Sequence, residues 1–295
     1  MTTTSRLRIA TRGSAQARTQ AEVVAASLRA AHVGLEVELV FVETTGDVRS
    51  DVPLHQIGGQ GVFVREVQRA VLDGRADLAV HSAKDLPSVT ADGLAIAAIT
   101  ERRDPRDALV GAPLAGLAPG ATVATGSVRR RAQLSVLRPD LEFVELRGNI
   151  HTRLEKVPAG GAIVMAVAAL QILGLTDRIA ETLDATAMIP QVGQGAVAIE
   201  CRADDRATLA ACASIEHAGS RRDVEVERAF LAELGGGCTL PVGAHVMPDP
   251  ATGRRALGVF IALGGDVRQW WEPLGRRGHD DHDVARAAAA PYAEG

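Results

Sequence analysis

The segment LRIATRGSAQARTQAEVVAASLRAA, residues 7–31, decides the fold of this chain. It opens with a short apolar run at Leu7–Ala10, which predicts a strand. The run ends at Thr11-Arg12-Gly13-Ser14, and a helical pattern follows from about Ala15 to Ala31, with Ser14 as the expected N-cap. A strand, a short loop and a helix in this order present free backbone N–H groups to an anion. The segment therefore predicts one βα unit of an α/β fold.

The same alternation recurs along the chain. A glycine cluster, Gly58-Gly59-Gln60-Gly61, precedes a predicted helix from about Val62 to Asp73. The other strands predicted from apolar runs are Val37–Val42, Asp77–His81, Thr122–Ala124, Leu141–Leu146 and Ala162–Val167. Further helices are expected to begin at Ser127, before Arg153 and at Ala168. The glycine-rich segment Pro190–Val197 suits a strand that crosses between domains. Two βα series of similar size predict two α/β domains.

The last part of the chain has a different pattern. A helix predicted at Arg221–Leu234 precedes strand-like runs near Ala244–Met247 and Leu257–Leu263, which indicates a smaller α+β domain. Residues after about Arg276 are polar and alanine-rich, and we expect a frayed terminus there. The run His279–Asp283 could bind a metal, but a solvated polar tail is the preferred interpretation.

Composition narrows the class of protein. A chain of 295 residues is too long for a single hydrophobic core, so two or three domains are expected. Aromatic residues are only 3%, so the cores should consist of Ala, Val, Leu and Ile. A net charge of −4 argues against a nucleic-acid binder. No signal peptide and no apolar run of about 18 residues is present, so we expect a cytosolic protein without a membrane span. Three cysteines without CxxC spacing argue against a disulfide framework or structural zinc.

Charged residues follow the predicted strands. They are Arg12, Asp47, Asp85, Arg129, Arg130, Arg147 and Arg153. Ligands of open α/β sheets bind at the carboxyl ends of strands, so the set predicts a site, although any one of these arginines could be a solvated surface residue. Arginine suits bidentate recognition of carboxylate or phosphate. No GxxxxGK[ST] loop is present, and the glycine cluster is interpreted as a flexible turn.

Two residues could carry chemistry. Asp85 follows a buried strand, and among basic groups it should stay ionised, where it could stabilise a cation or move protons at a nitrogen. A loop or helix-capping aspartate is the alternative. Cys238 follows three glycines and could be a nucleophile if positive charge favours its thiolate; a small buried residue is the alternative. Cys201 and Cys212 are interpreted as small buried residues, and His81 as a packed, hydrogen-bonded histidine in preference to a catalyst.

Eight segments in order resemble the porphobilinogen deaminase family, also called hydroxymethylbilane synthase. They are RIATRGS (8–14), GGQGVFVRE (58–66), ADLAVHSAKDLP (76–87), RDPRDAL (103–109), VRRRAQL (128–134), LRGNIHTRL (146–154), PQVGQGAVAIE (190–200) and GGGCTLPVG (235–243). The resemblance implies two βα domains like type II periplasmic binding proteins and a small α+β C-terminal domain. The implied boundaries are 1–99 with 195–218, 100–194, and 219–295.

The resemblance also implies an activity. The family binds a dipyrromethane cofactor by a thioether, here on Cys238, and adds four porphobilinogen units with loss of ammonia. Hydrolysis then releases the linear tetrapyrrole, and Asp85 matches the catalytic aspartate. The residues implied to contact the cofactor are Lys84, Ser127, Arg129 and Arg130. Those implied to contact substrate are Arg12, Ser14, Arg147 and Arg153, with Gln20 and Gln194 as weaker matches. Acetate and propionate groups on each pyrrole would explain the arginines.

Four positions depart from the family pattern. Ile172 stands where an arginine is usual, Gln60 and Gln56 where lysines are frequent, and Gly126 where serine is common. We therefore hypothesise a divergent member or second copy of the enzyme, with weaker or altered substrate binding. A non-catalytic binder of pyrroles or polycarboxylates is the alternative, and retention of Asp85 and Cys238 argues against it. The expected partners are a small-molecule substrate, with no nucleic acid and no membrane, and the expected state is a monomer.

Overall fold

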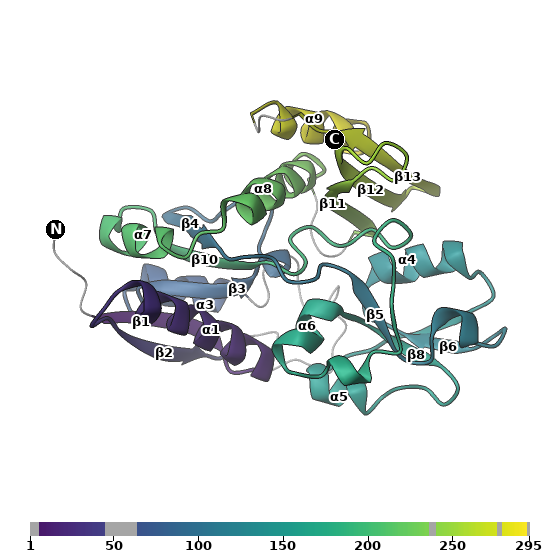
Figure 1. Ribbon diagram of the computed structural model, residues 1–295, viewed down its shortest axis with the longest axis horizontal. Helices are drawn as coiled ribbons and strands as arrows, with labels where there is room; N and C mark the ends of the chain where they lie inside the picture. Colours follow the sequence, from purple (N-terminus) through teal and green to yellow (C-terminus); the bar gives the residue numbers. More distant parts are fainter. Residues whose placement is uncertain (1–5, 45–63, 236–239, 276–278, 294–295) are drawn as a thin grey trace. The chain divides into compact units, whose positions relative to one another are not determined.

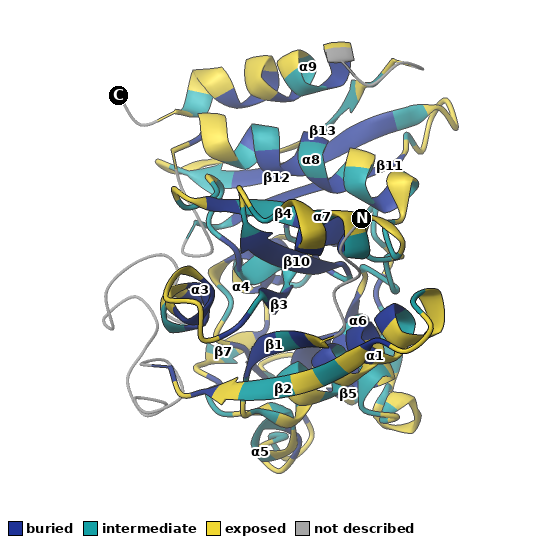
Figure 2. Cartoon of the chain, turned by 90° about the vertical axis from the view of Figure 1, so that its left-hand side faces the viewer, coloured by how far each residue is buried: buried dark blue, intermediate teal, exposed yellow. Residues whose placement is uncertain are grey.

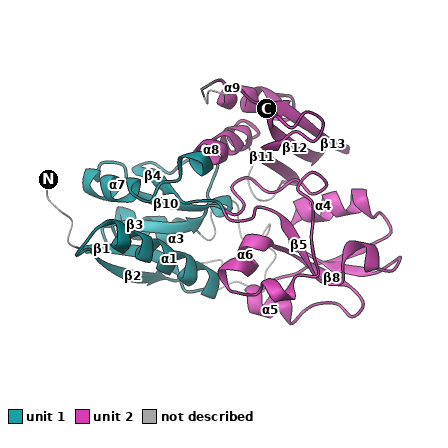
Figure 3. Ribbon diagram, in the orientation of Figure 1, with its two compact units in different colours: residues 1–102, 196–221 teal, residues 103–195, 222–295 magenta. Residues whose placement is uncertain are grey.

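The computed structural model describes residues 6–44, 64–235, 240–275 and 279–293. It divides into two compact units (Figure 3): unit 1 comprises residues 1–102 and 196–221, and unit 2 comprises residues 103–195 and 222–295. The division into three domains at the boundaries expected above stays a prediction. Among the described residues, no helix is long and apolar enough to cross a membrane.

Unit 1 is built on a five-stranded sheet with the order β2-β1-β3-β10-β4 (Figure 1). Its strands are β1 (Arg6–Arg12), β2 (Glu36–Val42), β3 (Leu78–Ser82), β4 (Leu94–Ile99) and β10 (Val197–Arg202). Its helices are α1 (Ala15–Ala31), α3 (Arg65–Leu72) and α7 (Arg206–Ala213), with a 3-10 turn at Ala83–Asp85. β1 runs parallel to β2 and β3, whereas β10 is antiparallel to β3 and β4. Burial along nearly all of β10 matches its interior place in the sheet (Figure 2).

Unit 2 contains a second five-stranded sheet of the same pattern, β7-β6-β8-β5-β9. Its strands are β5 (Asp107–Gly111), β6 (Thr122–Ala124), β7 (Glu142–Val144), β8 (Ala162–Ala166) and β9 (Glu181–Thr182). Its helices are α4 (Val128–Leu137), α5 (Ile150–Leu154) and α6 (Val167–Ile172), with 3-10 turns at Leu114–Gly116 and Thr176–Arg178. In each sheet the strand beside the edge, β10 or β5, follows a passage of the chain from the other unit and runs antiparallel to its inner neighbour.

The C-terminal part of unit 2 forms a separate three-stranded antiparallel sheet, β11-β12-β13. Its elements are α8 (Ala218–Glu233, with its first residues in unit 1), β11 (Val242–Pro248), β12 (Arg255–Leu263), β13 (Asp266–Pro273) and α9 (His279–Ala289), with a 3-10 turn at Ala290–Tyr292. Phe230 and Leu257 pack in its core with Ala285. The predicted fold class, two βα domains and a small C-terminal α+β domain, is confirmed.

Two structural predictions were wrong. The segment Pro190–Val197 is not a strand, because Gly193 and Gly195 adopt φ of 69° and 88°, and the strand begins only at Val197. Residues 279–289 do not belong to a polar tail, because they form α9, which packs three alanines into the core of the C-terminal part. Asp281 of the supposed solvated run is buried and paired with Arg255.

Candidate active site

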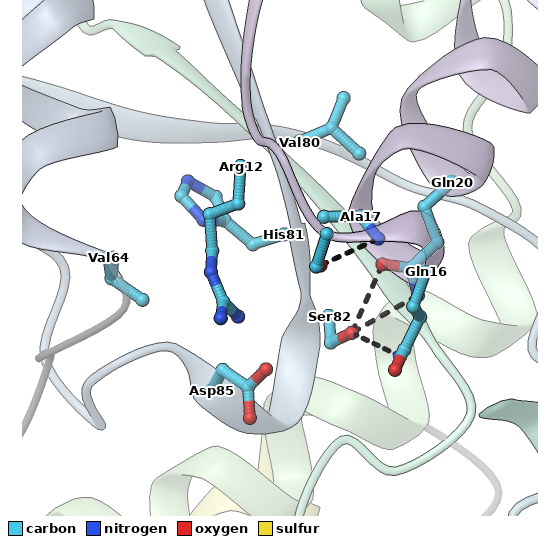
Figure 4. A pocket seen from close by; sticks show the side chains of 10 residues that line it. Arg12, Gln16, Ala17, Gln20, Val64, Val80, His81, Ser82 and Asp85 are labelled. Atoms are coloured by element: carbon cyan, nitrogen blue, oxygen red, sulfur yellow. Dashed lines mark hydrogen bonds between the residues drawn. The ribbon is translucent and has the colours of Figure 1, made fainter. Parts of the chain in front are cut away.

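A small pocket of about 40 Å³ lies in unit 1 at the carboxyl ends of β1 and β3 (Figure 4). The polar residues that line it are Arg12, Ser14, Gln16, Gln20, His81, Ser82 and Asp85. β1 and β3 are parallel neighbours, so their carboxyl ends meet at one edge of the sheet. The structure thus brings together four of the predicted site residues, Arg12, Ser14, Gln20 and Asp85.

Arg12 and Asp85 face each other across this pocket. Arg12 is the last residue of β1, and Asp85 ends the 3-10 turn that follows β3. Both side chains are half-buried, and Figure 4 shows the Arg12 guanidinium pointing toward the Asp85 carboxylate. Lys84 precedes Asp85 in the same turn and is also half-buried. A half-buried carboxylate beside a cation is accessible to a small ligand, and Asp85 can therefore contact a ligand in this conformation.

The walls of the pocket are held by amide and hydroxyl side chains. Ser14 caps α1, since its Oγ accepts from the backbone N–H of Ala17 at 3.3 Å. Gln16 and Gln20 each donate through Nε2 to Oγ of Ser82, at 3.3 and 3.1 Å. α1 and the end of β3 are therefore tied together directly beside Asp85. Gln20 lines the pocket, and its predicted role in substrate binding stays a prediction.

His81 forms the buried back of the pocket, with 6% of its surface exposed. Its Nε2 lies 3.2 Å from Oε2 of Glu200 on β10, and Gln68 on α3 donates to both oxygens of that carboxylate. Nε2 of His81 makes no hydrogen bond of acceptable geometry within the described chain, so its contact with Glu200 is a close approach of a ring nitrogen to a carboxylate. His81 is packed, as the sequence predicts, but the predicted hydrogen bond is not found at Nε2.

A second group of predicted residues lies in unit 2, at the start of α4. Ser127 caps this helix, as predicted, with its Oγ 3.4 Å from the backbone nitrogen of Arg130. Arg129 and Arg130 are buried, with 3% and 7% of their surfaces exposed. The partner of both is Asp107 on β5, which is completely buried. Its Oδ2 lies 2.8 Å from Nη1 of Arg129, and its Oδ1 lies 2.8 Å from Nη2 of Arg130.

Asp107 is a residue that sequence reasoning missed. Burial by itself raises the pKa of Asp107, but the charges of Arg129 and Arg130 outweigh that effect, and the pKa lies well below its usual range. Burial lowers the pKa of Arg129, and Asp107 opposes that shift. Gln194, fully buried, donates to Asp107 at 2.9 Å and to the carbonyl of Pro105 at 2.7 Å. The motif RDPRDAL carried the signal, but a buried charge cannot be recognised from sequence pattern.

Arg147 and Arg153 lie on the segment after β7. Both are half-buried. Arg153 donates through Nε to the carbonyl of Gly148 at 2.8 Å, and Nε of Arg147 is buried with no hydrogen-bond partner in the described ranges. Asn149 caps α5 by accepting from Thr152. The two predicted substrate arginines thus lie close together in the sequence, Arg147 in the connection after β7 and Arg153 in α5.

The departures from the family pattern have different structural settings. Ile172 is the half-buried last residue of α6. A Cβ at Gly126 would lie 2.7 Å from the carbonyl oxygen of Leu146, so this backbone path leaves no room for serine. Gln56 and Gln60 lie outside the described residues, as do Asp47 and Cys238.

The other two cysteines are buried in the core of unit 1, as predicted. Burial raises the pKa of the Cys201 thiol to about 11 and that of Cys212 to about 12. Neither is suited to nucleophilic chemistry near neutral pH. In the described ranges, no group of three or more side chains could hold a metal ion.

Known proteins resemble this chain along most of its length. Residues 7–210 match the dipyromethane cofactor binding domain of porphobilinogen deaminase, and residues 222–250 match the C-terminal domain of the same protein. The porphobilinogen deaminase of Nitratidesulfovibrio vulgaris is 48% identical over 82% of this chain and 78% of its own length. That of Acidothermus cellulolyticus is 50% identical over 81% and 74%.

Solved structures resemble it more distantly. The methionine binding protein MetQ is 16% identical with a TM-score of 0.45, over 76% of this chain and 94% of its own. Because the family model matches most of the chain and the relatives are about half identical to it, the chain belongs to the porphobilinogen deaminase family.

Proposed function

We propose that this protein is a hydroxymethylbilane synthase, a transferase of tetrapyrrole biosynthesis. It condenses four porphobilinogen units onto a dipyrromethane primer on Cys238, releases ammonia at each step and hydrolyses off hydroxymethylbilane. The observation that carries the proposal is the pocket of unit 1, in which Asp85 shares a small cavity with Arg12 and Ser14 in a chain of this family.

Asp85 supplies the negative charge that the reaction needs. Loss of ammonia from porphobilinogen leaves a cation spread over the pyrrole ring and its nitrogen, and attack by the next pyrrole gives another cation. A fixed carboxylate at the pyrrole N–H stabilises both, and it can accept the proton that restores the aromatic ring. The 3-10 turn fixes the place of Asp85, and the tie between α1 and Ser82 keeps the opposite wall in position.

Arg12 binds the carboxylate side chains of the substrate in this proposal. Porphobilinogen carries an acetate and a propionate, and a guanidinium beside the pocket binds such a group through paired hydrogen bonds. The substrate is then oriented with carboxylates toward Arg12 and its pyrrole nitrogen toward Asp85, since the two side chains face each other in the pocket.

The residues at the start of α4 fit a dipyrromethane cofactor. Two buried guanidinium groups face one carboxylate, which leaves one positive charge in excess. Nε and Nη2 of Arg129 are buried and lack a hydrogen-bond partner within the described chain. An acidic ligand would satisfy both features, and we propose that Ser127, Arg129 and Arg130 hold it. The same role for Lys84, in the turn of Asp85, is proposed on the family resemblance alone. When bound, the cofactor supplies the pyrrole carbon to which the first substrate is joined.

Intact-protein mass spectrometry tests the proposal. Protein expressed in a haem-making host should carry an added mass of two pyrrole units, and purified protein should convert porphobilinogen to hydroxymethylbilane. The Cys238→Ser variant should lack the added mass, whereas the control Cys201→Ser should retain it, because Cys201 is a buried core residue. A parent protein without any adduct would overturn the proposal.

We also propose the family's cellular setting for this chain, a cytoplasmic monomer that acts on a small molecule. Sedimentation of the purified protein should give the mass of one chain. A stable dimer would contradict this part and leave the proposed activity untouched.

A further inference from the structure

The two buried arginines of α4 depend on groups from three other places in unit 2. Nη1 of Arg129 donates to the carbonyl of Ile189 at 2.8 Å, in addition to its ion pair with Asp107. Arg130 donates through Nε and Nη2 to Oδ1 of Asp107, at 3.0 and 2.8 Å, and through Nη1 to the carbonyl of Val164 at 3.1 Å. Asp107 is the one carboxylate that both arginines share.

Asp107 is itself held from a third direction. Nε2 of Gln194 donates to Oδ1 of Asp107 at 2.9 Å, and the same amide group is anchored on the carbonyl of Pro105. Asp107 also belongs to β5, where it pairs with Ala166 of β8. The carboxylate therefore stands on an interior strand and has little freedom to follow a movement of either arginine.

The hydrogen bonds of Arg129 are divided unequally. One side of its guanidinium, Nη1, is occupied by Asp107 and Ile189. The other donors, Nε and Nη2, are buried and have no partner in the described part of the chain. A buried N–H without a partner is destabilising, and native proteins rarely leave one. The fork that remains, Nε with Nη2, has the spacing that binds a carboxylate through two parallel hydrogen bonds.

We propose that Asp107 is a positioning residue: by holding Nη1 of Arg129 and two donors of Arg130, it turns the free fork of Arg129 toward a carboxylate of the cofactor. This inference rests on the proposed function, because it takes the dipyrromethane as the acidic ligand. Asp107 does not touch the cofactor. Its effect appears in how completely the protein is loaded, through the geometry of Arg129, while the chemistry at Asp85 proceeds in each loaded molecule.

The test compares full-length variants made in the same haem-making host. Asp107→Asn keeps the shape of the side chain and removes its charge, and Arg129→Lys keeps a positive charge near Asp107 and removes the Nε–Nη2 fork. Asp104→Asn is the matched control, because Asp104 pairs with Arg106 at 2.5 Å and has no contact with the two arginines among the described interactions. Each protein is passed through size exclusion, so that only folded monomer is measured, and the loaded fraction is read from intact mass.

Both test variants should show a loaded fraction about tenfold or more below the parent, as expected for a lost pair of charge-assisted hydrogen bonds. In the loaded remainder of Asp107→Asn, the KM for porphobilinogen should match that of the parent. Asp104→Asn should load like the parent. Full loading of Arg129→Lys would overturn the inference, as would equal loading of Asp107→Asn and Asp104→Asn. Because Arg129→Lys leaves Asp107 and Arg130 in place, it decides the question if Asp107→Asn fails to fold. An unloaded parent would instead count against the proposed function.

Discussion

Two turns of one design occupy equivalent places in the two five-stranded sheets. In unit 1, Arg12-Gly13-Ser14 joins β1 to α1, and in unit 2, Thr125-Gly126-Ser127 joins β6 to α4. We call them the first turn and the second turn. In each, a serine after a glycine caps the helix by accepting from the third helical residue, at 3.3 and 3.4 Å. β1 and β6 also hold the same place in their sheets, second from one edge.

The arginines lie on opposite sides of the glycine in these turns. Arg12 precedes it, ends its strand and borders an open pocket with Asp85. Arg129 and Arg130 follow it, begin their helix and are buried against Asp107. The same backbone arrangement thus has two uses. The first turn presents a half-exposed cation to a reacting molecule, and the second leads into a buried ion-pair cluster that is already held in place without a ligand. The comparison predicts that the first turn governs rate and the second governs stability and loading.

The largest effect is expected at Asp85, which faces Arg12 of the first turn across the pocket. Asp85→Asn removes the charge opposite Arg12 and should lower kcat by about 100- to 10,000-fold, the usual range for a group that moves protons or stabilises charge. Because Asp85 is half-exposed, the melting temperature and the loaded fraction should stay near those of the parent. Steady-state kinetics with porphobilinogen, thermal melting and intact mass measure the three quantities. A large fall in melting temperature would break the comparison.

Asp107, the partner of the two arginines that follow the second turn, should respond in the opposite way. Asp107→Asn leaves two buried guanidinium groups without a counter-charge and should cost about 3–5 kcal/mol of unfolding free energy. The depressed pKa of Asp107 adds stability that is fully present above its unfolded pKa of about 3.9 and is lost as the pH falls through the lower folded value. Urea unfolding from pH 7 down to pH 3 should therefore show a smaller acid-dependent loss in the variant than in the parent. Equal pH profiles would contradict this assignment.

A pair of alanine substitutions sharpens the comparison of the two backbones. A Cβ at Gly126 would meet the carbonyl oxygen of Leu146 at 2.7 Å, whereas a Cβ at Gly13 has nothing within 4 Å, and neither glycine has a positive φ. Gly126→Ala should therefore destabilise the protein by about 1–3 kcal/mol. Gly13→Ala should be neutral or slightly stabilising, by less than about 1 kcal/mol. Urea unfolding of both variants measures the difference in unfolding free energy. Similar losses of stability would show that the close approach of Leu146 does not distinguish the two turns.

The smallest effect is expected at Ile172, where the family's usual arginine is missing. Ile172→Arg should restore one charge on α6 and lower the KM for porphobilinogen by about three- to tenfold, the worth of one partly exposed charge-assisted contact. Gln171→Arg is the control, since it adds the same charge at the neighbouring exposed position. An equal change in both variants would indicate a general charge effect, and no change at Ile172 would contradict the hypothesis that this residue limits binding.

Sequence patterns predict the elements with a clear local signal better than elements that are exposed or whose neighbours lie far away in the sequence. They place α1 and β6 at their observed bounds, because a serine cap or an apolar run marks each end. They miss β13, most of whose residues are exposed, and α9, whose short alanine face carries no strong apolar period. They also miss β4 and β5, whose neighbour β10 or β8 comes from a distant part of the sequence.

The candidate site divides in the same way. Arg12, Ser14 and Asp85 follow strands that a local pattern reveals, and the structure places them in one pocket. Asp107 could not be found from pattern, because a buried aspartate at the start of an apolar strand reads as a loop residue until its partners on α4 are known. Arg129 and Arg130 were predicted as ligand contacts, and their ion pairs with Asp107 depend on a strand that the pattern missed.

The split course of unit 1 affects how the chain folds while it is being synthesised. β10 lies between β3 and β4, yet about ninety residues of unit 2 separate it from β4 in the sequence. A ribosome that has released residues 1–102 has made four strands of the first sheet, and the edge strand β4 still lacks its neighbour. The second sheet, residues 107–182, has no such gap. The N-terminal sheet can therefore be completed only after residues 107–182 of the second sheet have been made, although its first strands are made earlier, and a nascent chain exposes the β3 edge until Val197–Arg202 emerges.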